Sequence, residues 1–278
     1  MVDLEEYRRS SLDNWNRFSD NWADEHEFLA RTTGAVGERM VDRLDPVTGQ
    51  TMLELAAGTG DTGFRIAQRL GDDGRLLMTD FAAGMVDAAR RRGEAQGVSN
   101  VDYRVLDAER MDLADDSFDG VACRFGYMLM ADPARALAET RRVLRYGGRL
   151  VFAVWAAPDR NAWAAIAGMT MVELGHMEPP EPGRPSMFAM ADPDRIAELV
   201  TGAGFGAPAV EQVAMDWGYS TADEHWQKTL KLAGPIADAY GSLEPDAQDE
   251  VREKVSERVT ERLGNDGLGG LVHVVVAT

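Results

Sequence analysis

The sequence is poor in the residue that forms covalent cross-links. Its 278 residues contain one cysteine, Cys123, so an internal disulfide and a thiolate metal cluster are both excluded. The four histidines show no metal-ligand spacing with acidic residues, and neither a Gly-x-Ser-x-Gly loop nor a Cys-His arrangement indicates a hydrolase. We therefore expect a protein of a reducing compartment without a bound metal.

Positive charge is also scarce. Lysine and arginine together number 29 against 47 aspartates and glutamates, which gives a formal net charge of -18. Such a chain repels the phosphates of a nucleic acid, so DNA and RNA are disfavoured as partners. A solvated acidic surface that aids solubility explains the excess without any role in a mechanism.

Long apolar stretches are missing as well. The longest strongly apolar run, 271–277, is far too short to cross a bilayer. Residues 1–24 alternate charged and aromatic side chains and lack the apolar core of a secretory signal peptide. We expect a cytoplasmic protein with no membrane span. Apolar residues still make up 45% of the chain, which is enough to bury a core.

From Thr51 onward, short apolar runs alternate with amphipathic stretches, the pattern of βα units in a parallel sheet covered by helices. The predicted strands are 51–55, 75–79, 101–106, 118–123 and 149–155. The predicted helices between them are 63–70, 85–92 and 133–144, and Gly147-Gly148 should end the last one. These elements predict an α/β protein with an open, doubly wound sheet.

The rest of the chain divides around this core, which is expected at 46–155. Residues 1–45 are predicted as a helical cap, because Trp15, Phe18 and Trp22 recur at helical spacing. Residues 156–190 are rich in proline, methionine and glycine and are predicted as a mobile loop or lid. Residues 191–278 should complete the core. Their predicted elements are a helix at 192–202, strands at 209–213 and 271–277, and a helical insertion at about 221–264.

The glycine loop after the first predicted strand is the first functional signal. It contains Gly58, Gly60 and Gly63, and glycine lets a backbone approach a ligand closely. The spacing Gly58-x-Gly60-x-x-Gly63 also fits the dinucleotide fingerprint, with Asp80 placed to hold a ribose. The motif alone leaves open a nicotinamide-dependent oxidoreductase and an S-adenosylmethionine enzyme.

Two more acidic residues favour S-adenosylmethionine. Glu54 lies four residues before Gly58, where it can hold the cationic amino-acid end of that cofactor through the loop. Asp107 ends the third strand and can accept a hydrogen bond from the adenine amino group, while the Ala108 N–H faces a ring nitrogen and Met85 covers the ring. Ligands of open α/β sheets bind at the carboxyl ends of the strands. Carboxylates in three consecutive units therefore predict a cofactor site.

Four segments between Met52 and Trp155 carry a family resemblance: 53–60 (LELAAGTG), 107–109 (DAE), 116–119 (DSFD) and 142–148 (RVLRYGG). In these segments the chain resembles class I S-adenosylmethionine-dependent methyltransferases of the UbiE-like, quinone-biosynthesis type. Segments 124–133 and 187–193 are similar to one bacterial branch of that family. Two residues depart from the pattern, since Ala56 replaces the first loop glycine and Tyr146 replaces a proline. Neither change removes a proposed hydrogen bond to the cofactor.

The resemblance implies a Rossmann-like, seven-stranded sheet whose last strand runs antiparallel to the rest. It also implies transfer of a methyl group from S-adenosyl-L-methionine, with S-adenosyl-L-homocysteine as the product. Arg124, Phe125 and Gly126 would border the methionine end of the cofactor. The residues expected to contact the cofactor are Glu54, Ala56, Gly58, Gly60, Asp80, Phe81, Met85, Asp107, Ala108 and Arg124.

The methyl acceptor is expected to be a small apolar or aromatic molecule that is methylated on carbon or oxygen. Methyl transfer is an in-line displacement that needs the acceptor positioned and dry, so it requires no nucleophile. The residues expected to contact the acceptor are Trp22, Phe125, Tyr127, Trp163 and Phe188. If the acceptor must lose a proton, the candidate bases are His26, His176, Tyr127 and Tyr219. His225 and His273 are expected to lie farther away.

The small acceptor is thus the expected partner, and a homodimer is compatible with the sequence. Two other functions stay open beside methyl transfer. One is a nicotinamide-dependent oxidoreductase, which the glycine spacing allows. The other is a regulatory module that binds S-adenosylmethionine and no longer methylates anything.

Overall fold

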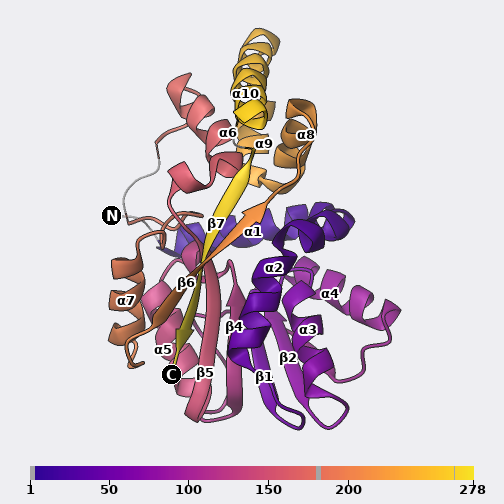
Figure 1. Cartoon of the computed structure of the whole chain (residues 1–278), viewed down its shortest axis with the longest axis vertical. Helices are drawn as coiled ribbons and strands as arrows, with labels where there is room; N and C mark the ends of the chain where they lie inside the picture. The colour runs from indigo at the N-terminus through magenta and orange to yellow at the C-terminus, as the bar shows by residue number, and fades with distance from the viewer. Residues whose placement is uncertain (1–3, 180–182, 266) are drawn as a thin grey trace.

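The computed structural model describes residues 4–179, 183–265 and 267–278, in which one sheet carries helices on both faces (Figure 1). The seven strands lie in the order β3-β2-β1-β4-β5-β7-β6. Neighbours among β1 to β5 are parallel, whereas β7 is antiparallel to both β5 and β6. The strands are β1 (Thr51–Leu55), β2 (Arg75–Asp80), β3 (Val101–Val105), β4 (Phe118–Arg124), β5 (Leu144–Trp155), β6 (Ala209–Asp216) and β7 (Gly269–Ala277). The predicted sheet with its antiparallel last strand is confirmed.

The strand order places a crevice between β1 and β4. The chain runs outward from β1 to β3 and then returns to the other side of β1 with β4, so the loops after β1 and β4 diverge at their carboxyl ends. The all-parallel 3-2-1-4-5-6 order of dinucleotide-binding sheets is not the one found here, because the antiparallel β7 lies between β5 and β6.

The helices follow from local signals that the sequence carries. Two of them begin at Asp-Pro pairs, where the side chains of Asp132 and Asp192 accept backbone N–H bonds and proline occupies the first turn. The helices are α1 (Leu4–Asp24), α2 (His26–Leu44), α3 (Asp61–Leu70), α4 (Ala83–Ala95), α5 (Pro133–Val143), α6 (Ala162–Glu173), α7 (Pro193–Gly202), α8 (Ala222–Leu232), α9 (Gly234–Gly241) and α10 (Pro245–Asn265). Short 3-10 turns occur at η1 (Tyr127–Leu129) and η2 (Pro158–Arg160).

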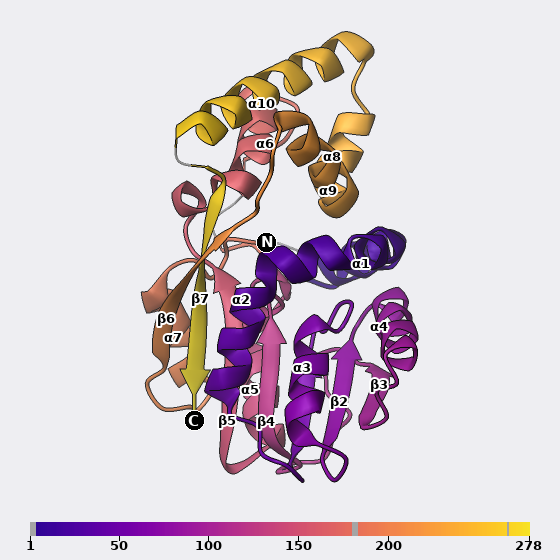
Figure 2. The ribbon, with the colours of Figure 1, turned by 45° about the vertical axis from the view of Figure 1, so that its right-hand side comes forward.

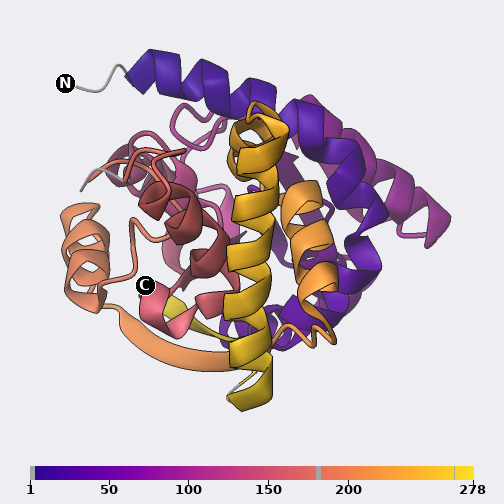
Figure 3. The ribbon, with the colours of Figure 1, turned by 90° about the horizontal axis from the view of Figure 1, so that it is seen from above.

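Seven of the described helices form two groups. In Figure 2, α2 and α3 lie in front of the sheet and α5 behind it, which covers the core on both faces. The other group is the helical lobe, α6, α8, α9 and α10, which lies beyond the carboxyl ends of the strands. Figure 3 shows α6 and α8 on opposite sides of α10, whose Val251, Val255 and Val259 form its buried stripe. Helix α1 runs between the lobe and the core (Figure 2).

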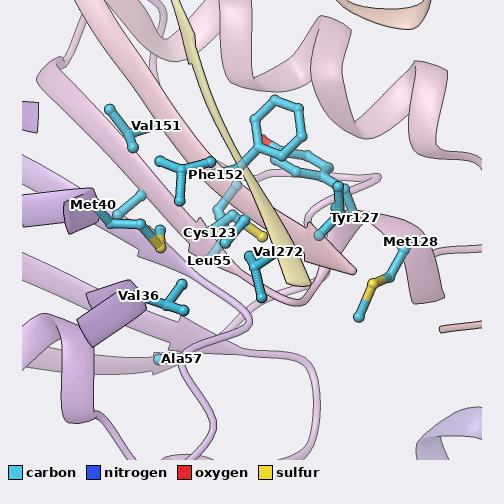
Figure 4. Packing of buried hydrophobic residues seen from close by; sticks show 14 of the residues in the cluster. Val36, Met40, Leu55, Ala57, Cys123, Tyr127, Met128, Val151, Phe152 and Val272 are labelled. Atoms are coloured by element: carbon cyan, nitrogen blue, oxygen red, sulfur yellow. The ribbon is translucent and has the colours of Figure 1, made fainter. Parts of the chain in front are cut away.

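The core is continuous across the sheet. Val36 and Met40 of α2 lie on the same side of the sheet as Val151 of β5, whereas Leu55 of β1 and Phe152 of β5 point to the opposite side, and all five side chains are buried (Figure 4). The apolar runs that predicted strands are therefore the interior of a doubly covered sheet. Among the described helices, none is both long and apolar enough to cross a membrane.

Two local predictions are wrong. The segment 156–190 is not a loop throughout, because its first half forms α6. Proline is absent from 162–173, which is rich in alanine and methionine, good helix formers. The pair Gly147-Gly148 does not end α5 either, because the chain leaves the helix at Val143 and both glycines lie inside β5. Gly147 has a φ of 80° there, beside a register shift against β4.

One buried amide joins the start of the segment 156–190 to the last strand. The Asn161 side chain is fully buried, and its Nδ2 donates to the carbonyls of Ala156 and Leu271, each at 3.0 Å. Its Oδ1 accepts from the Leu271 N–H at 3.1 Å and from the Trp163 indole at 3.2 Å. All of its hydrogen-bonding capacity is therefore used inside the protein.

We expect Asn161→Ala to lower the free energy of unfolding by about 3 kcal/mol, because it strands several buried partners. Urea unfolding followed by circular dichroism measures this. Asn265→Ala is the control, since the exposed Asn265 amide bonds one helix carbonyl and its loss should cost less than about 0.5 kcal/mol. Equal losses in the two variants would contradict this role of Asn161.

Candidate functional site

The glycine loop leaves β1 and enters α3 at the carboxyl edge of the sheet. Three of its residues have positive φ: Ala56 at 49°, Gly58 at 54° and Gly60 at 88°. A Cβ built on Gly58 would meet no atom within 4 Å, so this face of the loop borders open space. A Cβ on Gly63, in the first turn of α3, would collide with the Glu54 carboxylate. The loop is therefore open on one side and packed against Glu54 on the other.

Ala56 is not neutral for the backbone of this loop. A residue with a side chain costs about 1–2 kcal/mol in the left-handed region, which glycine avoids. The Ala56 methyl group is 2.6 Å from the place where a Cβ on Gly126 would lie. The alanine at position 56 thus requires glycine at position 126.

Glu54 is a carboxylate buried beneath the loop. Its side chain is 1% exposed, and its Oε2 has no hydrogen-bond partner among the described residues. Burial raises the pKa of Glu54 to about 8, although the positive charge of Arg124 and the backbone N–H of Gly63 act in the opposite direction. A buried acceptor without a donor is costly. The site therefore has an unmet demand for a donor, and a cation would satisfy it best.

Two arginines bind the glycine loop and the first turn of α3. Arg92 of α4 donates to the Thr59 carbonyl and pairs with Asp61 at 2.8 Å. Arg124, at the end of β4, reaches the other Asp61 oxygen at 3.5 Å and donates to the Thr33 hydroxyl. Arg124 was expected to contact the cofactor, and its guanidinium is instead engaged with α2 and α3. Asp61 and Arg92 were missed, because nothing in the sequence links α4 to the loop.

Asp80 supports the loop from the next strand. Its Oδ2 accepts from the Gly58 N–H at 2.9 Å, and its Oδ1 accepts from the Ala82 N–H at 3.0 Å. Burial raises the pKa of Asp80, and these N–H groups oppose that rise. Each carboxylate oxygen keeps a second lone pair, so Asp80 can hold the loop and still accept from a ribose hydroxyl. Phe81 follows it and is half-buried.

The loop after β3 completes the arrangement. The Asp107 Oδ1 accepts from the Glu109 N–H at 2.9 Å, which folds residues 107–109 into a turn, here called the adenine turn. Ala108 and Glu109 are both buried. Glu54, Asp80 and Asp107 thus lie at the carboxyl ends of three neighbouring strands, Glu54 within β1, Asp80 as the last residue of β2 and Asp107 just after β3. Met85 is 1% exposed on α4, so little of its surface is available to cover a ring.

A cluster of aromatic side chains, here called the aromatic wall, begins at Phe125 directly after β4 and at Trp155 at the end of β5. Phe125 stacks on Trp155 with ring centroids 4.1 Å apart and planes 5° from parallel, and its own φ is 62°. Trp163 lies 3.9 Å from Trp217, which has Tyr219 stacked 6.0 Å away. The members of the aromatic wall are Phe28, Phe125, Trp155, Trp163, Trp217 and Tyr219. The Trp217 indole nitrogen is buried without a partner among the described residues.

His225 adjoins this wall, contrary to the expectation that it lies far away. It is fully buried, and its ring meets Tyr219 edge-on at 5.1 Å. Its Nε2 is 2.7 Å from the Trp163 carbonyl. A carbonyl only accepts, so Nε2 carries the hydrogen and the unpartnered Nδ1 keeps the lone pair. Burial lowers the pKa of His225, which favours the neutral ring.

Tyr127 was predicted both as a base and as an acceptor contact, and both predictions are wrong. Its side chain is fully buried, with the ring against Phe152 at 5.1 Å (Figure 4) and the hydroxyl 2.6 Å from the Thr140 hydroxyl. Burial raises the pKa of Tyr127 well above its usual value. The 3-10 turn η1 directs this ring into the core and away from the crevice.

The other predicted residues are spread around the carboxyl edge. Phe188 and His176 lie on the chain that follows α6, and both are half-buried. The Trp22 indole donates to the Leu232 carbonyl at 3.2 Å, which joins α1 to α8. His26 begins α2, and its Nδ1 is 2.8 Å from the Ala23 carbonyl in the last turn of α1. The described residues contain no group of acidic, histidine or cysteine side chains that could hold a metal.

Known proteins match this chain in sequence. The family described as the ubiE/COQ5 methyltransferase family matches residues 36–177, just over half of the chain. Aklanonic acid methyltransferase DauC of Streptomyces sp. (strain C5) is 34% identical over 42% of this chain and 53% of its own. Demethylmenaquinone methyltransferase of Deinococcus radiodurans is 32% identical over 46% of this chain and 56% of its own. The chain spans about half the length of such relatives.

Solved structures share the fold. The YcgJ protein of Bacillus subtilis superposes with a TM-score of 0.57, over 87% of this chain and 96% of its own, at 15% sequence identity. An identity this low supports the architecture alone.

We expect Tyr127→Phe to leave catalytic turnover within about twofold of the unaltered protein while lowering the free energy of unfolding by about 1 kcal/mol, the value of one buried hydroxyl bond. Steady-state turnover and urea unfolding measure the two effects. A large loss of turnover without a loss of stability would restore Tyr127 as a catalytic residue.

We expect Glu54→Gln to change how stability depends on pH. Between the ordinary pKa of 4.5 and the folded value of about 8, the folded state holds a proton that the unfolded state releases, so stability falls as pH rises. Glutamine removes this loss. The variant should gain on the order of 3 kcal/mol over the unaltered protein between about pH 5 and about pH 8.

Urea unfolding at the two pH values measures that gain. Glu38→Gln is the matched control, because Glu38 is exposed and its ion pair among the described residues is with Arg65 at the surface. A Glu54→Gln difference that is the same at both pH values would show that the carboxyl is already ionised when folded.

Proposed function

Because the chain belongs to the ubiE/COQ5 methyltransferase family, we propose that it transfers the methyl group of S-adenosylmethionine to a carbon or oxygen of a small apolar or aromatic molecule. One observation carries most of this proposal. The orphaned Glu54 oxygen lies beneath a glycine loop whose Gly58 faces open space. A cationic ligand held by that loop satisfies a buried acceptor that the described protein leaves unmet.

The residues present fit this cofactor. Glu54 would hold its ammonium group, Asp80 its ribose hydroxyls, and Asp107 with the Ala108 N–H its adenine. The Gly58 face accommodates a ligand against the backbone because no side chain occupies it. When bound, S-adenosylmethionine supplies a methyl group made electrophilic by its positively charged sulfur.

The aromatic wall supports the proposed acceptor. Phe125 directly follows β4 and so connects the crevice at the switch point to Trp155 and the rest of the wall. Flat apolar side chains favour a flat apolar partner, with a few polar groups to orient it. The two relatives are named for aklanonic acid and demethylmenaquinone. The wall excludes water and fixes orientation, which is what methyl transfer needs from the protein.

A general base is needed only if the acceptor must be deprotonated. Of the candidates, Tyr127 is occupied by Thr140 and Tyr219 has its pKa raised by burial. Burial lowers the pKa of His225, which favours the neutral ring, and its Nδ1 keeps a lone pair beside the aromatic wall. We propose His225 for any proton that the acceptor has to lose, on condition that the acceptor displaces the rings around it, because the His225 side chain is fully buried.

Binding of the cofactor tests the proposal first. S-adenosylhomocysteine at one hundred times its Kd should stabilise the protein by about 2.7 kcal/mol, seen as a rise in Tm, whereas NADH should not. Release of S-adenosylhomocysteine should then follow addition of S-adenosylmethionine with a suitable quinone, phenol or polyketide-like acceptor. Stabilisation by NADH alone would reject methyl transfer in favour of an oxidoreductase.

Gly58→Ala sharpens the same test. The added methyl group enters the open face of the loop and should weaken S-adenosylhomocysteine binding by more than about tenfold, roughly 1.4 kcal/mol. Gly97→Ala is the matched control, because Gly97 also has a positive φ, 70°, and open space around its Cβ position, but lies between α4 and β3. Equal effects on binding would show that backbone strain, not the cofactor, explains the loss.

A further inference from the structure

Phe28 is the member of the aromatic wall that α2 contributes, and two positive charges lie against its ring. The Lys228 ammonium of α8 is 4.8 Å from the ring centroid, and the Arg31 guanidinium, one turn farther along α2, is 5.5 Å from it. A cation at such a distance is attracted by the face of an aromatic ring. Basic residues number 29 against 47 acidic ones in this chain, so two cations on one buried ring concentrate the scarcer charge.

The two cations differ in what they already bind. Lys228 pairs with the buried Glu25, to which Lys231 also binds at 2.9 Å, so one carboxylate is shared between two lysines. Arg31 is exposed, and its contact with the described part of the chain is the Phe28 ring. No carboxylate in that part of the chain forms an ion pair with Arg31. The guanidinium is therefore available to a ligand.

A third donor belongs to the ring beside Phe28. The Trp217 ring centroid is 5.7 Å from that of Phe28, the Trp217 side chain is 3% exposed, and its indole N–H has no partner among the described residues. A buried donor without an acceptor is unfavourable for the folded state. Since Arg31, Lys228 and the Trp217 indole can only donate, the ligand that satisfies them together is an acceptor with negative charge.

The aromatic wall connects these donors to the crevice between β1 and β4. Its rings follow one another from Phe125 to Trp155, Trp217 and Phe28, with successive centroids 4.1, 6.2 and 5.7 Å apart. Phe125 lies at the crevice end of this series, and the cations lie at the Phe28 end. A flat molecule on the wall can therefore place one end at the crevice and an acidic group at Phe28.

We propose that Arg31, assisted by Lys228 and the Trp217 N–H, binds a carboxylate of the methyl acceptor, which makes the acceptor a flat aromatic acid. A carboxylate fits because its two oxygens match the two parallel N–H groups of a guanidinium. The inference rests on the proposed function, which identifies the ligand of the wall as the methyl acceptor. The carboxylate orients the acceptor from the end opposite the crevice and takes no part in the transfer.

The three donors are not equally accessible. Arg31 is exposed, so a carboxylate reaches it directly. The Trp217 N–H is buried, so the carboxylate reaches it only when the neighbouring rings part. Arg31 is therefore the residue whose change tests the site most directly.

The preference of the unaltered protein for an acid over its amide is the first measurement. The anthraquinone acid rhein and its primary amide share one flat frame and differ in charge at a single group. Isothermal titration of each into the full chain, with S-adenosylhomocysteine in excess, gives two Kd values. The acid should bind at least about tenfold more tightly than the amide, because a hydrogen bond to a charged group is worth that much more.

Arg31→Met keeps the aliphatic stem and removes the charge. It should weaken binding of the acid by about tenfold and leave the amide within about twofold, whereas a loss of packing would weaken both probes alike. Arg39→Met is the matched control, because Arg39 is exposed on the same helix and faces Glu211 of β6 at 4.0 Å. Its acid-to-amide ratio should stay within about twofold of the unaltered protein. Arg31→Lys keeps the charge without the fork and should give an intermediate ratio.

Equal affinities for the acid and the amide, no binding of either, or an unchanged ratio in Arg31→Met would overturn the carboxylate site while leaving the cofactor assignment intact. Failure of the unaltered protein to bind S-adenosylhomocysteine would instead overturn the proposed function, and with it the identification of the acid as methyl acceptor. A preference for the acid that Arg31→Met removes and Arg39→Met keeps supports the site.

Discussion

Burial of the Glu54 carboxylate beneath the glycine loop constrains everything around it. The carboxylate is desolvated and has an unpartnered oxygen, which is unfavourable for folding. It excludes any side chain at position 63 and brings the charge of Arg124 close. Buried polar groups in proteins normally have hydrogen-bond partners. Exceptions to this rule occur mainly at functional sites. The loop is therefore built for binding, and its stability is secondary.

The supports of the loop follow from that constraint. Asp80 fixes the Gly58 N–H, while Arg92 fixes the Thr59 carbonyl and Asp61. The left-handed Ala56 adds strain that these contacts must hold in place. A loop held from β2 and α4 on one side, and open at Gly58 on the other, presents its backbone to a ligand without having to rearrange.

Much of this could be predicted from the sequence, because it depends on local pattern. Apolar runs predicted the strands, and the carboxyl ends of neighbouring parallel strands necessarily meet, which placed Glu54, Asp80 and Asp107 on one edge. The antiparallel direction of the last strand came only from the family resemblance. The prediction of a loop at 156–190 failed because the composition of the whole segment hid the helix-forming residues of α6. The predicted helix end at Gly147-Gly148 failed because these glycines form an irregularity in β5.

Side-chain direction and distant contacts could not be predicted in this way. Tyr127 has the right chemistry for a base, but the turn η1 sends it inward to Thr140. His225 adjoins the wall only because α8 folds back against α6, far away in the sequence. The wall itself draws on α2, β4, β5, α6 and the chain after β6. The periodicity of a single segment cannot predict a cluster whose side chains come from five separate segments.

Helix α1 connects the two halves of the site physically. One side of it meets the adenine turn and α4 through Arg8 and Asn16, and the other meets α8 of the helical lobe through Trp22. The lobe also contributes Trp163 and His225, at or beside the aromatic wall. One helix therefore contacts the cofactor side and the acceptor side of the site at the same time.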